Sequence, residues 1–246
     1  MKNDSDHYLE VRKLISLPWK FLNRLRARGV RDTTKRTARY IKDLYLFLIE
    51  KYFDFRYRAD TSGIIAGAEG LQIQSEHRDN STGYEGIQPR IFQNLLKHLP
   101  IDYRNYVFID FGSGKGRALM MAAERQFKHV IGIEFSPLLH EAAQRNIDHF
   151  RKRMPHASGI ELIYGDAAQT DIPEGDLVCF FYNPFDACVM EKVILNLAHA
   201  HKQRGQNIFI AYRNPVCADL LERFDFLSLI YATHSYHIYQ SSSKTP

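Results

Sequence analysis

From Pro89 onward, short apolar runs alternate with segments of helical periodicity. The apolar runs read YVFIDF, HVIGIEF, GIELIYGD, DLVCFFYNPF and NIFIAYRN. Helical patterns stand between most of them, among them RALMMAAERQ and SPLLHEAAQRNIDHFRKRM. Strands that are apolar on both faces and separated by helices are typical of a parallel sheet covered on both sides. The pattern predicts an α/β protein with a Rossmann-like, doubly wound sheet.

The C-terminal segment departs from this alternation. FDFLSLIYATHSYHIYQ predicts two strands around a short turn, with no helix between them. Two strands joined in this way pair antiparallel. We therefore expect a mostly parallel sheet that ends in an antiparallel hairpin.

The first 58 residues differ from the remainder in charge and periodicity. They carry 15 Lys and Arg against 7 Asp and Glu, a net charge of +8 within a chain of +5. The apolar positions of PWKFLNRLRARG and TKRTARYIKDLYLFLIEKYFDF recur every three to four residues, which predicts helices. We divide the chain into a basic helical extension (1–58), a loop-rich connector or lid (59–88) and a larger domain (89–246). The basic helices would suit nucleic acid, an anionic membrane or the chain's own domain.

A glycine-rich loop follows the first predicted strand of the larger domain, in VFIDFGSGKGRAL. It lacks the third small residue of the dinucleotide fingerprint, and it lacks the Gly-Lys-Ser/Thr of a P-loop. It does contain D-x-G-x-G-x-G, formed by Asp110, Gly112, Gly114 and Gly116. Glycines allow positive φ and close approach of the backbone, and the next helix offers free N–H groups to an anion. Asp110 can accept a hydrogen bond from a ligand ammonium, so a ligand with both an amine and a carboxylate fits best.

Two further acids end the next two predicted strands. Glu134 closes VIGIEF, where a carboxylate can accept hydrogen bonds from both hydroxyls of a ribose. Asp166 closes LIYGD, where its side chain and the Ala167 amide can bind an adenine. The carboxyl ends of parallel strands meet at the edge where open α/β sheets bind ligands. The three acids in order therefore predict a nucleoside-containing cofactor at this edge.

At these residues, over roughly 89–240, the chain resembles the class I (seven-β-strand) S-adenosylmethionine-dependent methyltransferases. DFGSGKG is similar to the first motif of that family, Glu134 and Asp166 to its second and third acids, and FFYNPF to its fourth motif. The resemblance implies S-adenosyl-L-methionine as the cofactor. Asp110 and the glycine loop would hold its methionine part, Glu134 the ribose and Asp166 the adenine.

The segment Tyr182 to Phe185 bears on the methyl acceptor. YNPF is similar to the N/D-P-P-Y/F motif of amino-group methyltransferases, although it has a single proline. In that motif Asn and Pro oxygens accept hydrogens from the target nitrogen and the aromatic ring stacks on it, which implies catalytic roles for Asn183, Pro184 and Phe185. FIDFGSGKGRALMMAAE further resembles lysine methyltransferases. We expect a protein lysine or another amine as the acceptor.

The connector offers candidates for a lid over the cofactor. Asp60, Thr61, Tyr84 and Gln88 could close over it, with Tyr84 stacking on the cofactor or hydrogen-bonding to it. We expect Lys115, inside the glycine loop, to point outward, away from a sulfonium.

Other features of the chain narrow its class. The apolar run LYLFLI is too short to span a bilayer, and the first residues lack the layout of a signal peptide. Three cysteines without a CxxC pair predict reduced thiols in a cytoplasmic protein, and we expect no metal site. Two alternatives to an amine methyltransferase stay open: an RNA or DNA methyltransferase that uses the basic extension, and a non-catalytic scaffold that binds the cofactor.

Overall fold

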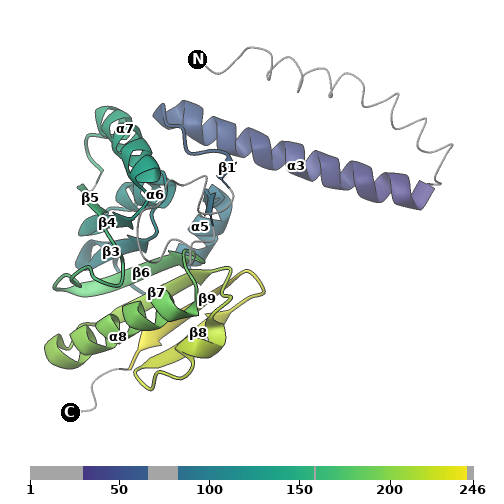
Figure 1. Ribbon diagram of the computed structural model, residues 1–246. Coiled ribbons are helices and arrows are strands. Elements are labelled where there is room, and N and C mark those ends of the chain that lie inside the picture. The colour runs from purple at the N-terminus through teal and green to yellow at the C-terminus, as the bar shows by residue number, and fades with distance from the viewer. Residues whose placement is uncertain (1–29, 66–82, 158, 243–246) are drawn as a thin grey trace. The chain divides into compact units, whose positions relative to one another are not determined.

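A computed structural model describes residues 30–65, 83–157 and 159–242 of the 246-residue chain, with side chains from residue 34. The chain divides into two compact units, with the boundary between Ile49 and Glu50. The first unit contains most of helix α3 (Val30–Tyr57), which confirms a helix where TKRTARYIKDLYLFLIEKYFDF predicts one (Figure 1). PWKFLNRLRARG lies outside the described residues.

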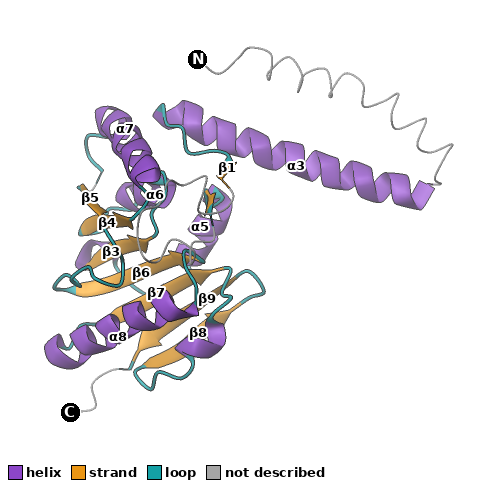
Figure 2. Cartoon of the chain, viewed as in Figure 1, coloured by secondary structure: helices purple, strands orange, loops and turns teal. Residues whose placement is uncertain are grey.

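The second unit is built on a seven-stranded sheet, seen as orange arrows in Figure 2. Its order along the sheet is β5-β4-β3-β6-β7-β9-β8. The parallel strands are β3 (Tyr106–Phe111), β4 (His129–Glu134), β5 (Ile160–Tyr164), β6 (Asp176–Tyr182) and β7 (Ile208–Arg213). Chain order therefore reverses at β3, whose neighbours are β4 and β6. At such a switch point the loops diverge and leave a crevice for a ligand.

The last two strands form the predicted antiparallel hairpin. β9 (Tyr236–Ser241) inserts between β7 and β8 (Leu227–Ala232) and runs antiparallel to both. The expected fold class, a Rossmann-like and mostly parallel sheet that ends in an antiparallel hairpin, is confirmed.

Helices cover both faces of the sheet because side chains alternate between the faces along each strand. On one face, Phe108 packs with α5 (Pro89–Leu96), α6 (Arg117–Glu124) and α7 (Pro137–Arg153). On the other, Val107 and Ile109 pack with α8 (Ala187–Arg204) and the short α9 (Ala218–Leu221). Proline stands in the first turn of α5, where its missing N–H costs no helical hydrogen bond. The two layers fix the strand ends from which the site is built.

Besides α9, three short elements were not expected from the sequence. A 3₁₀ turn (Tyr103–Asn105) precedes β3, and a two-stranded antiparallel pair is formed by β1 (Ile64–Ile65) and β2 (Tyr84–Glu85). The pair joins the two described ends of the connector. Phe53 and Tyr57, in the last turns of α3, pack into the core beside α7, and Tyr57 donates a hydrogen bond to Glu124 at 2.5 Å.

Candidate functional site

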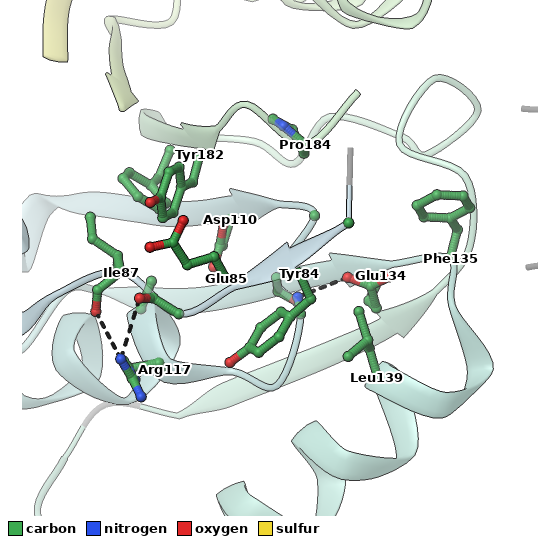
Figure 3. A pocket seen from close by; sticks show the side chains of 17 residues that line it. Tyr84, Glu85, Ile87, Asp110, Arg117, Glu134, Phe135, Leu139, Tyr182 and Pro184 are labelled. Atoms are coloured by element: carbon green, nitrogen blue, oxygen red, sulfur yellow. Dashed lines mark hydrogen bonds between the residues drawn. The ribbon is translucent and has the colours of Figure 1, made fainter. Parts of the chain in front are cut away.

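A cavity opens at the carboxyl ends of β3, β4 and β6, at the switch point of the sheet. Its volume is about 590 Å³, including the solvent at its mouth. Figure 3 shows the side chains around it. Six of the predicted site residues line it: Tyr84, Asp110, Gly112, Gly114, Glu134 and Pro184. A second cavity of about 330 Å³, again including open solvent, shares Gly112 and Phe135 with the first and is also lined by Asp166, Ala167 and Phe185.

The glycine loop is held against protein on both sides. Gly112 has φ +83°, and a Cβ built there would lie 2.5 Å from Cβ of Pro184. Gly114 has φ +55°, and a Cβ there would lie 2.4 Å from the Tyr84 ring. Carbon atoms in contact are normally about 3.5–4.0 Å apart, so neither position accommodates a side chain. Glycine here allows the fourth motif and the connector to approach the loop.

Glu134 joins the glycine loop to the next helix. Its two carboxylate oxygens accept hydrogen bonds from the amides of Gly114 and Ser136, each at 2.8 Å. The Gly112 and Ser113 amides donate to the Ile133 carbonyl just before it. Burial raises the pKa of Glu134 to about 7, while the amide hydrogen bonds act in the opposite direction. A carboxylate has about four lone-pair sites, so it can still accept from a ligand hydroxyl.

Asp110 is the more strongly perturbed of the two acids. It is 3% exposed, and burial raises its pKa well above the usual range, with the Glu134 charge adding to the effect. A cationic ligand group placed between these acids would favour their ionised forms. The pair therefore suits a ligand that carries positive charge.

The second cavity has the chemistry of a nucleobase site. Its lining is mostly apolar, from Ile133, Phe135, Phe185 and Val189. Asp166 stands at its edge, where its carboxylate accepts a hydrogen bond from the Ala168 amide at 2.8 Å. Because the two cavities share Gly112 and Phe135, one ligand can extend from the acids of the first into the apolar pocket of the second.

The turn from Tyr182 to Phe185 crosses the glycine loop. Asn183 has φ +42°, a left-handed conformation that Asn tolerates better than most residues. Pro184 lies on Gly112. Phe185 is 5% exposed, with its ring 6.2 Å from that of Phe181, on the side of the second cavity.

Gly116 and Asn183 are not among the residues that line the two cavities. Gly116 instead caps α6 at φ +84° and faces Ala143 and Ile147.

Tyr84 is the one lid candidate of the connector that lines the first cavity. It is 7% exposed and its hydroxyl donates to the Thr61 carbonyl at 2.6 Å. Thr61 is buried and donates its own amide and hydroxyl to Asp54. The Asp60 side chain is 68% exposed, and Gln88 is the residue that precedes α5. Lys115 lines neither cavity and so does point away from them, but it is not turned to solvent. Its side chain is 12% exposed, because Nζ donates to the Ser62 carbonyl and lies 5.3 Å from the Tyr84 ring centre.

The sequence reasoning also missed a buried arginine in the lining. Arg117, the first residue of α6, is 2% exposed. Nε donates to the Thr61 hydroxyl at 2.8 Å, and Nη1 donates to the carbonyls of Gly86 and Ile87. Nη1 also lies 3.7 Å from Glu50. Arg117 thus fastens the connector and the end of α3 to the helix that follows the glycine loop.

Other lining residues carry weak sequence signals. Phe135 directly follows the second acid and Tyr182 directly precedes Asn183 of the fourth motif. Both could therefore have been predicted as lining residues from their positions next to a motif. Glu85 and Leu139 lie in segments without a motif.

Two features of the described residues bear on the other expectations. Within the described residues no cluster of three His, Cys, Asp or Glu could hold a metal ion. No described helix is long and apolar enough to cross a membrane. The three cysteines are free thiols, and Cys179 is buried in the core.

Comparison with protein families gives a match over part of the chain. A family model described as "Histone methylation protein DOT1" matches residues 68–176, less than half of the chain, including the glycine loop and the strands that end in the three acids. The chain also has a seven-stranded sheet with a terminal hairpin, and the glycine loop and the acids lie at the switch point of that sheet. The chain is a class I S-adenosylmethionine-dependent methyltransferase. Its cofactor is S-adenosyl-L-methionine.

Solved methyltransferase structures are similar to this methyltransferase at low sequence identity. An RNA methyltransferase from Salinibacter ruber, in complex with S-adenosyl-L-homocysteine, is 21% identical, with a TM-score of 0.43 over 64% of this chain and 92% of its own. A 16S rRNA methyltransferase from T. thermophilus, in complex with AdoMet and guanosine, is 16% identical, with a TM-score of 0.46 over 63% of this chain and 43% of its own. The mitomycin 7-O-methyltransferase MmcR is 14% identical, with a TM-score of 0.45 over 61% and 52%. None of the curated protein sequences compared with this chain matches it.

Proposed function

We propose that this methyltransferase transfers the methyl group of S-adenosyl-L-methionine to a nitrogen acceptor, a protein lysine or another amine. The observation that carries the proposal is the contact of Pro184 with Gly112. It puts the segment that resembles an amino-group motif directly on the loop assigned to the methionine part of the cofactor. The match to a histone methylation family supports the same acceptor class.

The two cavities suit the parts of this cofactor. Asp110 would accept from the ammonium of the methionine part, with Gly112, Gly114 and Gly116 shaping the loop and Tyr84 covering Gly114. Glu134 would bind the ribose hydroxyls with its remaining lone pairs. Asp166 and Ala167 would bind the adenine in the second cavity.

The turn after β6 would serve the acceptor. Bound S-adenosyl-L-methionine supplies an electrophilic methyl group, so the protein has to position a neutral nitrogen in line with it, about 3–3.5 Å away. The Asn183 side-chain oxygen and the Pro184 backbone oxygen would accept hydrogens from that nitrogen. Such acceptors orient the nitrogen lone pair and stabilise the positive charge that develops on it. Phe185, buried on the adenine side, would hold the turn rigid and so keep the Asn183 and Pro184 oxygens in place.

A radiolabel transfer assay tests the acceptor class. Tritiated S-adenosyl-L-methionine is incubated with the full chain and, in parallel, with lysine-rich histones, total cellular protein and total RNA. We expect label in protein, stable to base, with methyl-lysine after acid hydrolysis, and loss of label with Asn183→Ala. Label confined to RNA would instead favour the nucleic-acid alternative that the basic extension (1–58) suggests.

A further inference from the structure

Two residues outside the predicted set stand beside the proposed acceptor turn. Tyr182 is the last residue of β6 and directly precedes Asn183, and Glu85 is the second residue of β2. Both line the first cavity. Figure 3 shows the Glu85 carboxylate and Tyr182 on the same side of the cavity, opposite Phe135. Glu85 is exposed and Tyr182 is partly buried, so the pair stands between the cavity and solvent.

The two side chains are electrostatically linked. Burial raises the pKa of Tyr182 to about 12, and the nearby Glu85 carboxylate adds to the increase. A phenol that donates its proton to a carboxylate keeps its oxygen lone pairs as acceptors. On the other side, Cζ of Arg213 lies 5.3 Å from the centre of the Tyr182 ring, and Nη1 of Arg213 donates to the Ser235 carbonyl. The guanidinium therefore lies over the Tyr182 ring.

We propose that Tyr182 and Glu85 form the acceptor subsite, and that this subsite takes an aliphatic amine that is cationic in solution, such as a lysine side chain. The inference rests on the proposed function and narrows its acceptor. The Tyr182 oxygen accepts an N–H of the amine beside Asn183. Glu85 orients the Tyr182 hydroxyl and attracts the incoming cation. The same exposed carboxylate repels the phosphates of a nucleic acid.

The transfer balances without a further reactant. The ammonium loses one proton to bulk water at the open mouth, where Glu85 is exposed. The nitrogen lone pair then forms the new N–C bond while the C–S bond breaks. Sulfur keeps that electron pair and S-adenosylhomocysteine leaves. The methylated nitrogen carries the positive charge, which the oxygens of Tyr182 and Asn183 stabilise.

Matched ligands test the subsite without knowledge of the acceptor. Sinefungin is an analogue of S-adenosylhomocysteine that carries an amine where the transferred methyl group stands. Calorimetry gives the dissociation constants of both ligands for the full chain, Glu85→Gln, Tyr182→Phe and the control Glu161→Gln. Glu161 is an exposed acid on β5 that pairs with His129 and lines neither cavity.

We expect Glu85→Gln to weaken sinefungin about tenfold and Tyr182→Phe to weaken it about fivefold, the scale of a charge-assisted and a neutral hydrogen bond. S-adenosylhomocysteine should bind both variants as it binds the unaltered chain, which also shows that the site is folded. Glu161→Gln should change neither ligand. Equal weakening of the two ligands, or unchanged sinefungin binding in Glu85→Gln, would overturn the subsite. In that case label in methyl-lysine would still support the proposed function, so the two failures are distinguishable.

Discussion

Gly112→Ala tests the contact between the glycine loop and the fourth motif. The substitution has two costs that the structure separates. An alanine at φ +83° costs roughly 1–2 kcal/mol, because Cβ crowds its own carbonyl in the left-handed region. In addition, the new Cβ would lie 2.5 Å from Cβ of Pro184, so the turn has to move by about 1 Å, at an overpacking cost of roughly 1–3 kcal/mol.

Gly175→Ala is the matched control, since Gly175 has φ +97° but no atom within 4 Å of its Cβ position. At roughly 2–4 °C per kcal/mol for a domain of this size, Gly112→Ala should lower the melting temperature about 2–12 °C more than the control does. Thermal unfolding followed by circular dichroism measures both. Methyl transfer should also fall about 100-fold, because a displacement of this size misplaces the acceptor groups. Equal melting temperatures for the two variants would refute the contact.

Three further substitutions test other parts of the site. Because burial raises the pKa of Glu134 from 4.5 to about 7, its contribution to stability is fully present below pH 4.5 and is lost as pH rises through 7, by ~3 kcal/mol. Glu134→Gln should flatten this pH dependence in urea unfolding, and an unchanged slope would contradict it. Arg117→Met leaves Glu50 and the Thr61 hydroxyl without their buried partner and should lower stability by ~3 kcal/mol, or about 6–12 °C in melting temperature; a loss under 1 °C would be inconsistent with the fastening role. Asn183→Ala should leave the calorimetric affinity for S-adenosylhomocysteine within about twofold and reduce methyl transfer about 100-fold or more, whereas full activity would remove Asn183 from the acceptor turn.

The part of the site that lies at the strand ends of the sheet was predictable from the sequence. Parallel strands begin and end together, so acids that end successive apolar runs must meet at one edge. Asp110 and Glu134 do line one cavity, and Asp166 lines the cavity beside it. The terminal hairpin was predictable for a similar reason, because two strands without a helix between them pair antiparallel.

The contacts between the connector (59–88) and the rest of the site were not predictable from the sequence. Arg117 looks like an ordinary exposed residue at a helix start, and its burial depends on carbonyls and a hydroxyl 30 to 56 residues earlier in the chain. β1 and β2 are two residues each, too short for any periodicity to reveal. Lys115 is covered only because the Ser62 carbonyl and the Tyr84 ring contact it. Non-local contacts of this kind leave no pattern in a single sequence.

Cofactor binding tests the central claim most directly. Calorimetry would titrate the full chain and Glu134→Ala with S-adenosylmethionine, S-adenosylhomocysteine, NAD and ATP. The site described here predicts micromolar binding of the first two, about −8 kcal/mol, with clear weakening in the variant and no comparable binding of NAD or ATP. Absence of S-adenosylhomocysteine binding up to millimolar concentration, or tighter binding of NAD, would contradict the assignment of this loop and its three acids.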